Sequence, residues 1–300
     1  MAVLVFGGLN IDLVVYVDRL PQPGETLIGS DFKEFAGGKG LNQAIAARRA
    51  GANVAMVGAV GDNAEILTSL LQEERMDTTY LLHKAGASGT ALIEVDRSGE
   101  NRIIVIPGAN GDVRSNDFAD SIFDQPEKIL LGQLEMNLGE VESLFARAKK
   151  HGFRTILNPS PVAELSPAFL KNVDLIVANQ HEAELLTGVE VHDQDSGYQA
   201  ADRLMEKGVR EVLITLSRDG AIYKDSQREL FQPAFPVIAV DTTGAGDAFC
   251  GALVATLAEG GSIEDALRHA AAAGALSVTK EGSSPSLPSK AHISSFLQSH

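Results

Sequence analysis

The 300-residue sequence has one cysteine, no tryptophan and no apolar run that approaches the length of a membrane-spanning helix. A single cysteine cannot form an intramolecular disulfide, which fits a reducing compartment. Cys250 lies inside a predicted helix after Phe249, so we interpret it as a small buried side chain and not as a nucleophile. The first residues lack the basic stretch and cleavage site of a signal peptide. We therefore expect a cytoplasmic protein without a membrane segment.

Positive charge is also scarce. Forty acidic residues stand against 25 basic ones, which gives a formal net charge of -15. A field of that sign disfavours binding to nucleic acid or to anionic membranes. Any phosphate group must then be held locally by backbone amides, a metal ion or a few lysines and arginines.

Several familiar nucleotide-binding motifs are missing. The chain has no G-x-x-x-x-G-K-[ST] loop, no G-x-G-x-x-G after its first strand, and no protein kinase signature set. The seven histidines show no spacing typical of metal ligands. Walker-type ATPases, Rossmann dinucleotide enzymes and protein kinases are therefore set aside.

Short apolar runs alternate with helical patterns through most of the chain. The patterns predict strands at 2–8, 53–61, 128–134, 154–160, 175–179 and 211–216. They predict helices at about 40–52, 64–74, 138–151, 181–187 and 196–207, two more after residue 246, and a last one at 290–298. Such alternation predicts an α/β fold, with a mainly parallel sheet flanked by helices and a single domain over residues 1–300.

Two segments interrupt this pattern. Residues 12–36 alternate polar and apolar side chains without a helix, and residues 90–107 read as a hairpin that turns at Ser98 and Gly99. The two could pair into one small β-sheet, whose apolar faces a ligand or a second subunit would cover. We therefore expect a lid that also forms a homodimer surface; the alternative is two unrelated edge hairpins.

The stretch DTTGAGDAF, residues 241–249, precedes an apolar helical pattern. Backbone amides and the positive end of a helix favour an anion there, and glycine lets a ligand approach closely. Asp247 nevertheless places a carboxylate in the same turn. Alone, a glycine loop before a helix is also explained by packing.

Three further clusters combine exposed backbone with polar groups. They are AGGKGLNQA at 36–44, GGLNIDL at 7–13 and NQHE at 179–182. Amide and carboxylate side chains at the ends of strands suit sugar hydroxyls, and the last cluster suits a hydrated Mg²⁺. Ordinary turns, or acids favoured by a helix dipole, would explain each cluster equally well.

Together these clusters resemble the ribokinase-like family of sugar kinases. The resemblance covers essentially the whole chain, and DTTGAGDAFCGAL (241–253) and GGKGLNQA (37–44) match the two signature regions of the family. The K-G-x-N-Q-A form, PGAN (107–110) and QLE (133–135) are more similar to ribokinases than to fructokinases or nucleoside kinases. The resemblance implies transfer of the γ-phosphoryl group of ATP to the 5-hydroxyl of D-ribose.

The resemblance also implies a role for residues at matching positions. Asp247 would be the catalytic base, and the anion hole would comprise Gly244, Ala245 and Gly246. The sugar would contact Asp247 and Asn10, Asp12, Gly38, Lys39, Asn42 and Glu135. ATP would lie along Asn179, Gly246 and the loop Leu216, Ser217, Arg218, Asp219, Gly220 and Ala221.

Two metal ions are implied in the same way. Glu182 would serve Mg²⁺ through water. A K⁺ ion beside the anion hole would be held, partly through backbone carbonyls, at Asp241, Thr243, Ser277, Lys280, Gly282 and Ser286.

The chain departs from the family near the expected adenine position, where Ala271 replaces the usual Asn or His. The nucleotide would then be held by packing and backbone. Alternative substrates are deoxyribose, a ketose, a sugar phosphate or a nucleoside. A non-catalytic sugar-binding regulator is a further alternative, although such a protein is expected to lose the loop acid or the anion hole.

Overall fold

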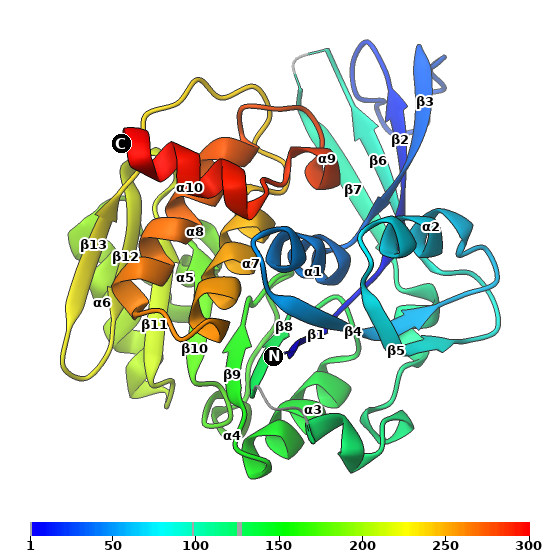
Figure 1. Cartoon of the computed structure of the whole chain (residues 1–300). Coiled ribbons are helices and arrows are strands. Elements are labelled where there is room, and N and C mark those ends of the chain that lie inside the picture. Colours follow the sequence, from blue (N-terminus) through cyan, green and yellow to red (C-terminus); the bar gives the residue numbers. More distant parts are fainter. Residues whose placement is uncertain (1, 98, 125–127) are drawn as a thin grey trace.

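A computed structural model describes residues 2–97, 99–124 and 128–300. Its main feature is a nine-stranded sheet in the order β13-β12-β11-β10-β9-β8-β1-β4-β5 (Figure 1). From β11 to β5 in this spatial order, every neighbouring pair of strands is parallel. Strands β12 and β13 pair antiparallel at the other edge. The predicted α/β class with a mainly parallel sheet is confirmed.

The strands of this sheet are β1 (Ala2–Phe6), β4 (Asn53–Val60), β5 (Asp77–His83), β8 (Ile129–Gly132), β9 (Arg154–Leu157), β10 (Leu175–Asn179), β11 (Glu211–Thr215), β12 (Gly220–Lys224) and β13 (Glu229–Pro233). Central strand β1 shows why both faces are covered. Val3 and Val5 pack into one buried cluster and Leu4 and Phe6 into the other, because successive side chains of a strand point to opposite faces.

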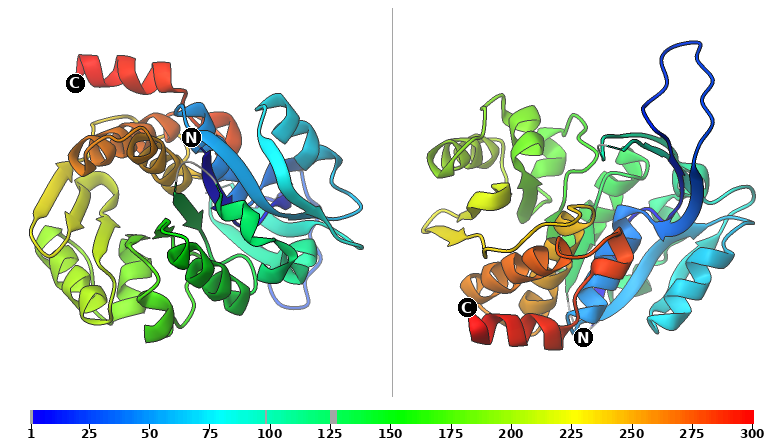
Figure 2. Two further views of the ribbon diagram at one scale, coloured as in Figure 1. Left: turned by 60° about the horizontal axis from the view of Figure 1, so that its bottom comes forward. Right: turned by 90° about the horizontal axis from the view of Figure 1, so that it is seen from above.

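Helices form a layer on each face of the sheet (Figure 2). One layer contains α1 (Lys39–Arg49), α2 (Glu65–Glu73), α7 (Ala245–Ala258), α8 (Ile263–Ser277) and α10 (Lys290–Ser299). The other contains α3 (Leu138–Lys150), α4 (Pro167–Leu170), α5 (Gln180–Thr187) and α6 (Gln194–Glu206). Short 3₁₀ turns η1 (Gly108–Asp112), η2 (Ser115–Asp117) and η3 (Asp120–Phe123) join the second layer. No helix in the described ranges is both long and apolar enough to cross a membrane.

A second, four-stranded sheet stands at one side of the body, in the order β3-β2-β6-β7. It contains β2 (Asn10–Tyr16), β3 (Asp31–Gly37), β6 (Gly89–Val95) and β7 (Asn101–Ile106). The two predicted lid segments therefore do pair, through a parallel ladder between β2 and β6 that joins two antiparallel hairpins. We call these four strands the lid sheet. Of the predicted turn at Ser98 and Gly99, Ser98 lies outside the described residues.

Several predicted boundaries change. Strands 128–134 and 154–160 are shorter, because polar residues at their ends turn toward the site instead of continuing the ladder. Strands β5, β12 and β13 were not predicted, since two are edge strands with half-exposed side chains and β12 follows a tight turn and not a helix. A short helix that the patterns do not predict, α9 (Ser283–Ser286), precedes the last helix.

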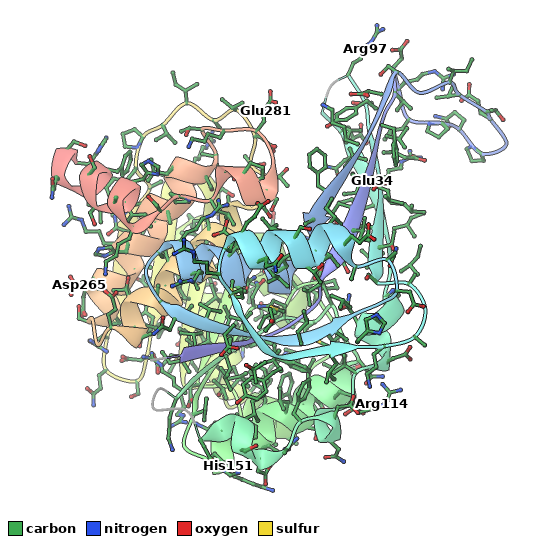
Figure 3. The ribbon with its side chains drawn as sticks, turned by 45° about the vertical axis from the view of Figure 1, so that its right-hand side comes forward. Glu34, Arg97, Arg114, His151, Asp265 and Glu281 are labelled. Atoms are coloured by element: carbon green, nitrogen blue, oxygen red, sulfur yellow. The ribbon has the colours of Figure 1, made fainter. Side chains whose placement is uncertain are left out.

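The carboxyl ends of the parallel strands lie at the same end of the molecule as the lid sheet. Figure 3 shows Glu34 and Arg97 on the lid and Glu281, in the turn before α9, at that end; His151 lies at the opposite end. Open parallel sheets bind ligands beyond the carboxyl ends of their strands. This end of the molecule is therefore where the predicted site residues should meet.

Candidate active site

Helix α7 begins directly after the glycine loop. Gly244 caps it with φ of 79°, a backbone conformation that favours glycine, and a Cβ there would lie 2.7 Å from Ser283 Oγ. The amides in the first turn of a helix have no carbonyl partner inside the helix. Gly246 needs neither a positive φ nor close packing, because a Cβ added there would meet no described heavy atom within 4 Å. The space above Gly246 thus leaves the helix end open to a ligand.

Asp247 lies in the first turn of α7 and is only 8% exposed. Its Oδ1 accepts a hydrogen bond from Gln43 Nε2 at 2.9 Å, and its Oδ2 accepts one from Asn42 Nδ2 at 3.2 Å. Burial raises the pKa of this carboxyl, whereas the charge of Lys39 and the two amide donors oppose the rise. The acid is therefore buried at the helix end but held by donors from α1.

Glycines bring the start of α1 against the end of β1. A Cβ on Gly40 would lie 2.4 Å from the carbonyl carbon of Gly7, so two backbones cross there without side chains between them. Gly37 similarly leaves room for the carboxylate of Asp12, which would lie 2.1 Å from an added Cβ. The GGK motif is thus explained by close approach of chain segments, which places Lys39 and Asn42 beside the lid.

The predicted sugar-binding residues converge at this crossing. Glu135, just after β8, accepts a hydrogen bond at 2.7 Å from the backbone amide of Lys39. Asn10, at the start of β2, is buried and accepts one from Asn110 Nδ2 at 2.9 Å. Because its oxygen is occupied, the amide nitrogen of Asn10 remains as a donor for a ligand.

The carboxylates around this space are strongly perturbed. Burial raises the pKa of Asp12 to about 7, and the charge of Asp247 adds to that effect. Burial also raises the pKa of Glu135 to about 7, although Lys39 opposes the shift. Burial lowers the pKa of Lys39, but the charges of Asp247 and Glu135 outweigh it, so the pKa lies above its usual range. A cluster of acids around one lysine, with Asp247 buried and Asp12 and Glu135 half-buried, is typical of a functional site.

Asn179, the last residue of β10, caps the neighbouring helix α5, and Glu182 lies in its first turn. They form a capping box, in which Glu182 N donates to Asn179 Oδ1 at 2.8 Å and Asn179 N donates to Glu182 Oε2 at 2.9 Å. These two bonds are enough to explain both residues as helix-capping groups. Oε1 of Glu182, however, accepts no hydrogen bond from the described residues. Glu182 is buried and its charge acts on Asp247, so it faces the same space.

The predicted ATP loop joins β11 to β12. It includes the 3₁₀ turn η4 (Ser217–Asp219), and Ser217 Oγ donates to Gln180 Oε1 at 3.1 Å, which places the loop beside the start of α5. The side chains of Leu216 and Ala221 are buried in the body, so only their backbone can face a ligand. Ala271, at the expected adenine position, lies on α8.

The residues predicted for K⁺ come from two segments that the structure brings together. Asp241 Oδ1 accepts from the amide of Thr243 at 2.9 Å, and its Oδ2 accepts from the amide of Gly282 at 2.8 Å. Ser277 and Ser286 are buried nearby in the chain, while their hydroxyls donate to carbonyls of their own segments. The described residues contain no metal-binding group of three or more His, Cys, Asp or Glu side chains. A cation there would depend mainly on carbonyl oxygens, which suits a monovalent ion.

Four amide side chains at the site, of which Asn158 is half-buried and the others are buried, had no predicted role: Gln43, Asn110, Gln133 and Asn158. Asn110 clamps the turn after β1, because its Oδ1 accepts from Leu9 N at 3.1 Å and its Nδ2 donates to Leu9 O at 3.0 Å. Three of the four lie inside motifs that the sequence singles out, GLNQA, PGAN and QLE. The motifs could have drawn attention to them, but only the fold shows their partners.

Comparison with known proteins gives the family. The model of the pfkB family of carbohydrate kinases matches residues 2–290. This chain belongs to that family. It is 38% identical over 303 residues to the ribokinase of Haemophilus influenzae, covering 98% of this chain and 97% of that one. It is 35% identical over 302 residues to the deoxyribokinase of Salmonella typhi, covering 99% of each chain.

Solved structures agree with the resemblance found in the sequence. The ribokinase of Arabidopsis thaliana, complexed with ribose and ATP, superposes with a TM-score of 0.92 at 28% identity and covers 99% of this chain and 98% of that one. The ribokinase of Thermotoga maritima gives a TM-score of 0.90 at 30% identity, covering 99% of each chain. The pfkB-family kinase described here therefore has the ribokinase fold, lid sheet included.

Proposed function

We propose that this kinase transfers the γ-phosphoryl group of ATP to the 5-hydroxyl of D-ribose. One observation carries the proposal: a buried carboxylate, Asp247, lies in the first turn of a helix whose end is left open at Gly246. Base and anion-binding amides are thus one residue apart. Full-length similarity to proteins named ribokinase supports ribose as the acceptor.

Proton transfer starts the reaction. A primary alcohol is a weak nucleophile until its proton is removed, and a carboxylate within hydrogen-bond reach accepts the proton as the new bond forms. Asp247 takes this role, and the sugar is held by Asn10, Asp12, Gly38, Lys39, Asn42 and Glu135. The hydroxyl oxygen bonds to phosphorus, and the bond from phosphorus to the bridging oxygen breaks as ADP leaves with the electron pair.

Negative charge must be stabilised in a site that is already acidic. The amides at Gly244, Gly246 and Asp247 lie at the positive end of α7 and would face the transferred group, whereas the amide of Ala245 donates to Thr242 O at 3.2 Å and would join them only if that bond breaks. ATP extends along Asn179 and residues 216–221. Mg²⁺ neutralises phosphate charge when it is bound; Glu182, with its unused Oε1, would hold it through water.

A monovalent cation completes the anion hole. Asp241 links residue 243 to residue 282, so the segments that carry Thr243, Ser277, Lys280, Gly282 and Ser286 are held together around one place. K⁺ bound there would stabilise the loop that ends at Gly244. Its positive charge would also offset the carboxylate of Asp247.

Deoxyribose is the second candidate acceptor, because a deoxyribokinase is 35% identical to this chain over nearly its full length. The two sugars differ by one hydroxyl, which the acidic pocket around Asp12 would bind. ADP release should therefore be measured with ribose, deoxyribose, fructose, a sugar phosphate and adenosine. We expect the highest kcat/KM with ribose and a 5-phosphate product; ADP release with none of these sugars would overturn the proposal.

We further propose that the chain is one kinase domain over residues 1–300, acts in the cytoplasm and forms a homodimer through the lid sheet. Apolar side chains are exposed on both faces of the lid. Phe35 and Val105 share the face of Asp12 by strand register, whereas Leu92 and Ile104 lie on the other face. A sugar covers only part of the first face, and a second lid would cover the rest.

A further inference from the structure

We propose that Gln43 is a positioning residue for phosphoryl transfer: it holds one oxygen of the Asp247 carboxylate and directs the other toward the sugar hydroxyl. The inference rests on the proposed role of Asp247 as base. Gln43 follows Asn42 in α1 and is fully buried behind the acid, at 0% exposure. It is therefore out of reach of the sugar and acts through Asp247.

Both protons of the Gln43 amide have assigned acceptors. Nε2 donates to Asp247 Oδ1 at 2.9 Å and to Asn158 Oδ1 at 3.0 Å. A rotated amide would turn its oxygen toward the carboxylate and lose both bonds. The donor is thus available to Asp247 only in one orientation of Gln43.

Two further amides, the buried Gln133 and the half-buried Asn158, fix that orientation. Gln43 Oε1 accepts from Gln133 Nε2 at 2.6 Å, and Asn158 Nδ2 donates to Val177 O at 3.0 Å. Gln133 follows β8 and Asn158 follows β9, which are adjacent central strands. The chain of amides therefore runs from the rigid sheet to Asp247 with every donor pointing in a defined direction.

The linked amides include one energetically unfavourable feature, which packing alone does not explain. Gln133 Oε1 is buried and has no hydrogen-bond partner among the described residues. An unsatisfied buried acceptor is unfavourable, and apolar side chains of the same shape would fill the space without it. These linked amides are explained if their role is to set the position and the charge state of Asp247.

The two oxygens of Asp247 are held unequally. Among the described residues, Oδ2 accepts from Asn42 Nδ2 alone, at the longer distance of 3.2 Å, while Asn42 Oδ1 accepts from Ser284 Oγ at 2.9 Å. We therefore assign Oδ2 as the oxygen that takes the hydroxyl proton. The O–H bond breaks toward Oδ2 as the hydroxyl oxygen bonds to phosphorus and ADP departs with the electron pair.

Gln43 also favours the ionised form of the acid. Burial raises the pKa of Asp247, and a donor to the charged form opposes this. The charged or titratable groups that act on or feel this carboxyl are Lys39 of α1, Glu182 of α5, Asp12 of β2, Glu135 after β8, and Cys250 on α7 itself. Because Gln43 is uncharged, replacing it changes a hydrogen bond and leaves those charges in place.

The test uses Gln43→Met in the full-length protein, with single-turnover rates measured against pH. We expect the acid limb of the profile to move up by about one pH unit, so that the rate below that limb falls about tenfold. The Kd for ribose, measured by calorimetry, should stay within about twofold, because the sugar does not touch Gln43. Ile45→Val, which shortens a buried side chain on the same helix, should leave the limb unmoved.

An unmoved acid limb in Gln43→Met, or an equal shift in Ile45→Val, would overturn the inference. If Gln43→Met does not fold, Gln133→Met serves instead: it removes the unpaired oxygen and the bond that orients Gln43, and should move the limb in the same direction by less. The proposed function fails separately, if Asp247→Asn retains normal turnover. A normal Gln43→Met profile beside an inactive Asp247→Asn variant would contradict only the positioning role.

Discussion

Gly246 and Asp247 are neighbours in the first turn of α7, yet the proposed mechanism gives them different partners. The open space above Gly246 and the amides around it suit a phosphoryl group, while the buried carboxylate, held by Asn42 and Gln43, suits the sugar hydroxyl. An acid in an anion-binding turn is therefore no contradiction. Each residue can be tested by a change that leaves the other in place.

Replacing Gly246 by alanine should separate ligand approach from folding. The Cβ meets no described atom, and alanine favours a helix, so the thermal unfolding temperature should stay equal or rise slightly. The phosphoryl-transfer rate should fall about 100-fold, because the methyl group occupies the space for the transferred group. Gly139→Ala is the matched control, since Gly139 holds the same second position in α3. Normal turnover in Gly246→Ala would exclude the helix end as the anion site.

In the ligand-free protein, the perturbed carboxyl of Asp12 should lower the free energy of unfolding. Its pKa rises from 3.8 to about 7 on folding, so the folded state binds more protons than the unfolded state between those values. The free energy of unfolding that Asp12 contributes therefore falls as pH rises from about 4 to 7. Asp12→Asn should stabilise the protein more at pH 8 than at pH 5, measured by urea unfolding, and should weaken ribose binding. Equal effects at both pH values would show that the carboxyl is not perturbed.

At the scale of elements, the site forms where the ends of β1, β8, β9 and β10 meet the starts of α1, α5 and α7. The sequence predicts most of this, because strand–helix alternation and glycine motifs are local signals. It also places Asp247 and Glu182 near helix starts, where the structure has them. Local patterns do not predict the bond from Gln43 to Asp247, which joins residues 204 positions apart. They also do not predict edge strands such as β5, whose pairing depends on the neighbouring strand.

The loop before α7 should respond to K⁺. Asp241 accepts hydrogen bonds from the amides of residues 243 and 282. Burial alone would raise the pKa of Asp241, but its hydrogen-bond donors outweigh burial, so the pKa is lowered. Wild-type protein should show higher activity and a higher unfolding temperature in K⁺ than in an equal concentration of Na⁺. Asp241→Asn should lose both differences. A wild-type protein indifferent to K⁺, Na⁺ and Cs⁺ would count against the cation site.

At the scale of the whole molecule, the lid sheet is the part where an apolar sequence and the exposure of its side chains disagree most. Strand β7 is exposed along its length although it contains four consecutive apolar residues, Ile103 to Ile106, and Ile104 is 64% exposed. Arg97 lies at the far end of the lid (Figure 3). It pairs with Asp18 at 2.7 Å. Exposed apolar surface of this extent typically marks an interface. We therefore propose that the lid sheet both covers the sugar and forms the dimer interface.

Ile104→Lys should convert the dimer to a monomer in analytical ultracentrifugation, because it places a charge in the proposed interface. Leu185→Lys, at an exposed apolar position on α5, should leave the dimer intact. The monomeric variant should also have a higher KM for ribose, since its lid lacks support. A wild-type protein that is already monomeric at micromolar concentration would contradict the dimer.

The central claim is that Asp247 removes the proton from the sugar hydroxyl. The most direct test compares Asp247→Asn with the wild type in single-turnover transfer from ATP to ribose, and in ribose binding by calorimetry. Asparagine keeps the size of the side chain but cannot accept the proton, so transfer should fall at least about 1000-fold while the Kd for ribose changes little. An Asp247→Asn variant that transfers phosphate at close to the normal rate would contradict the account.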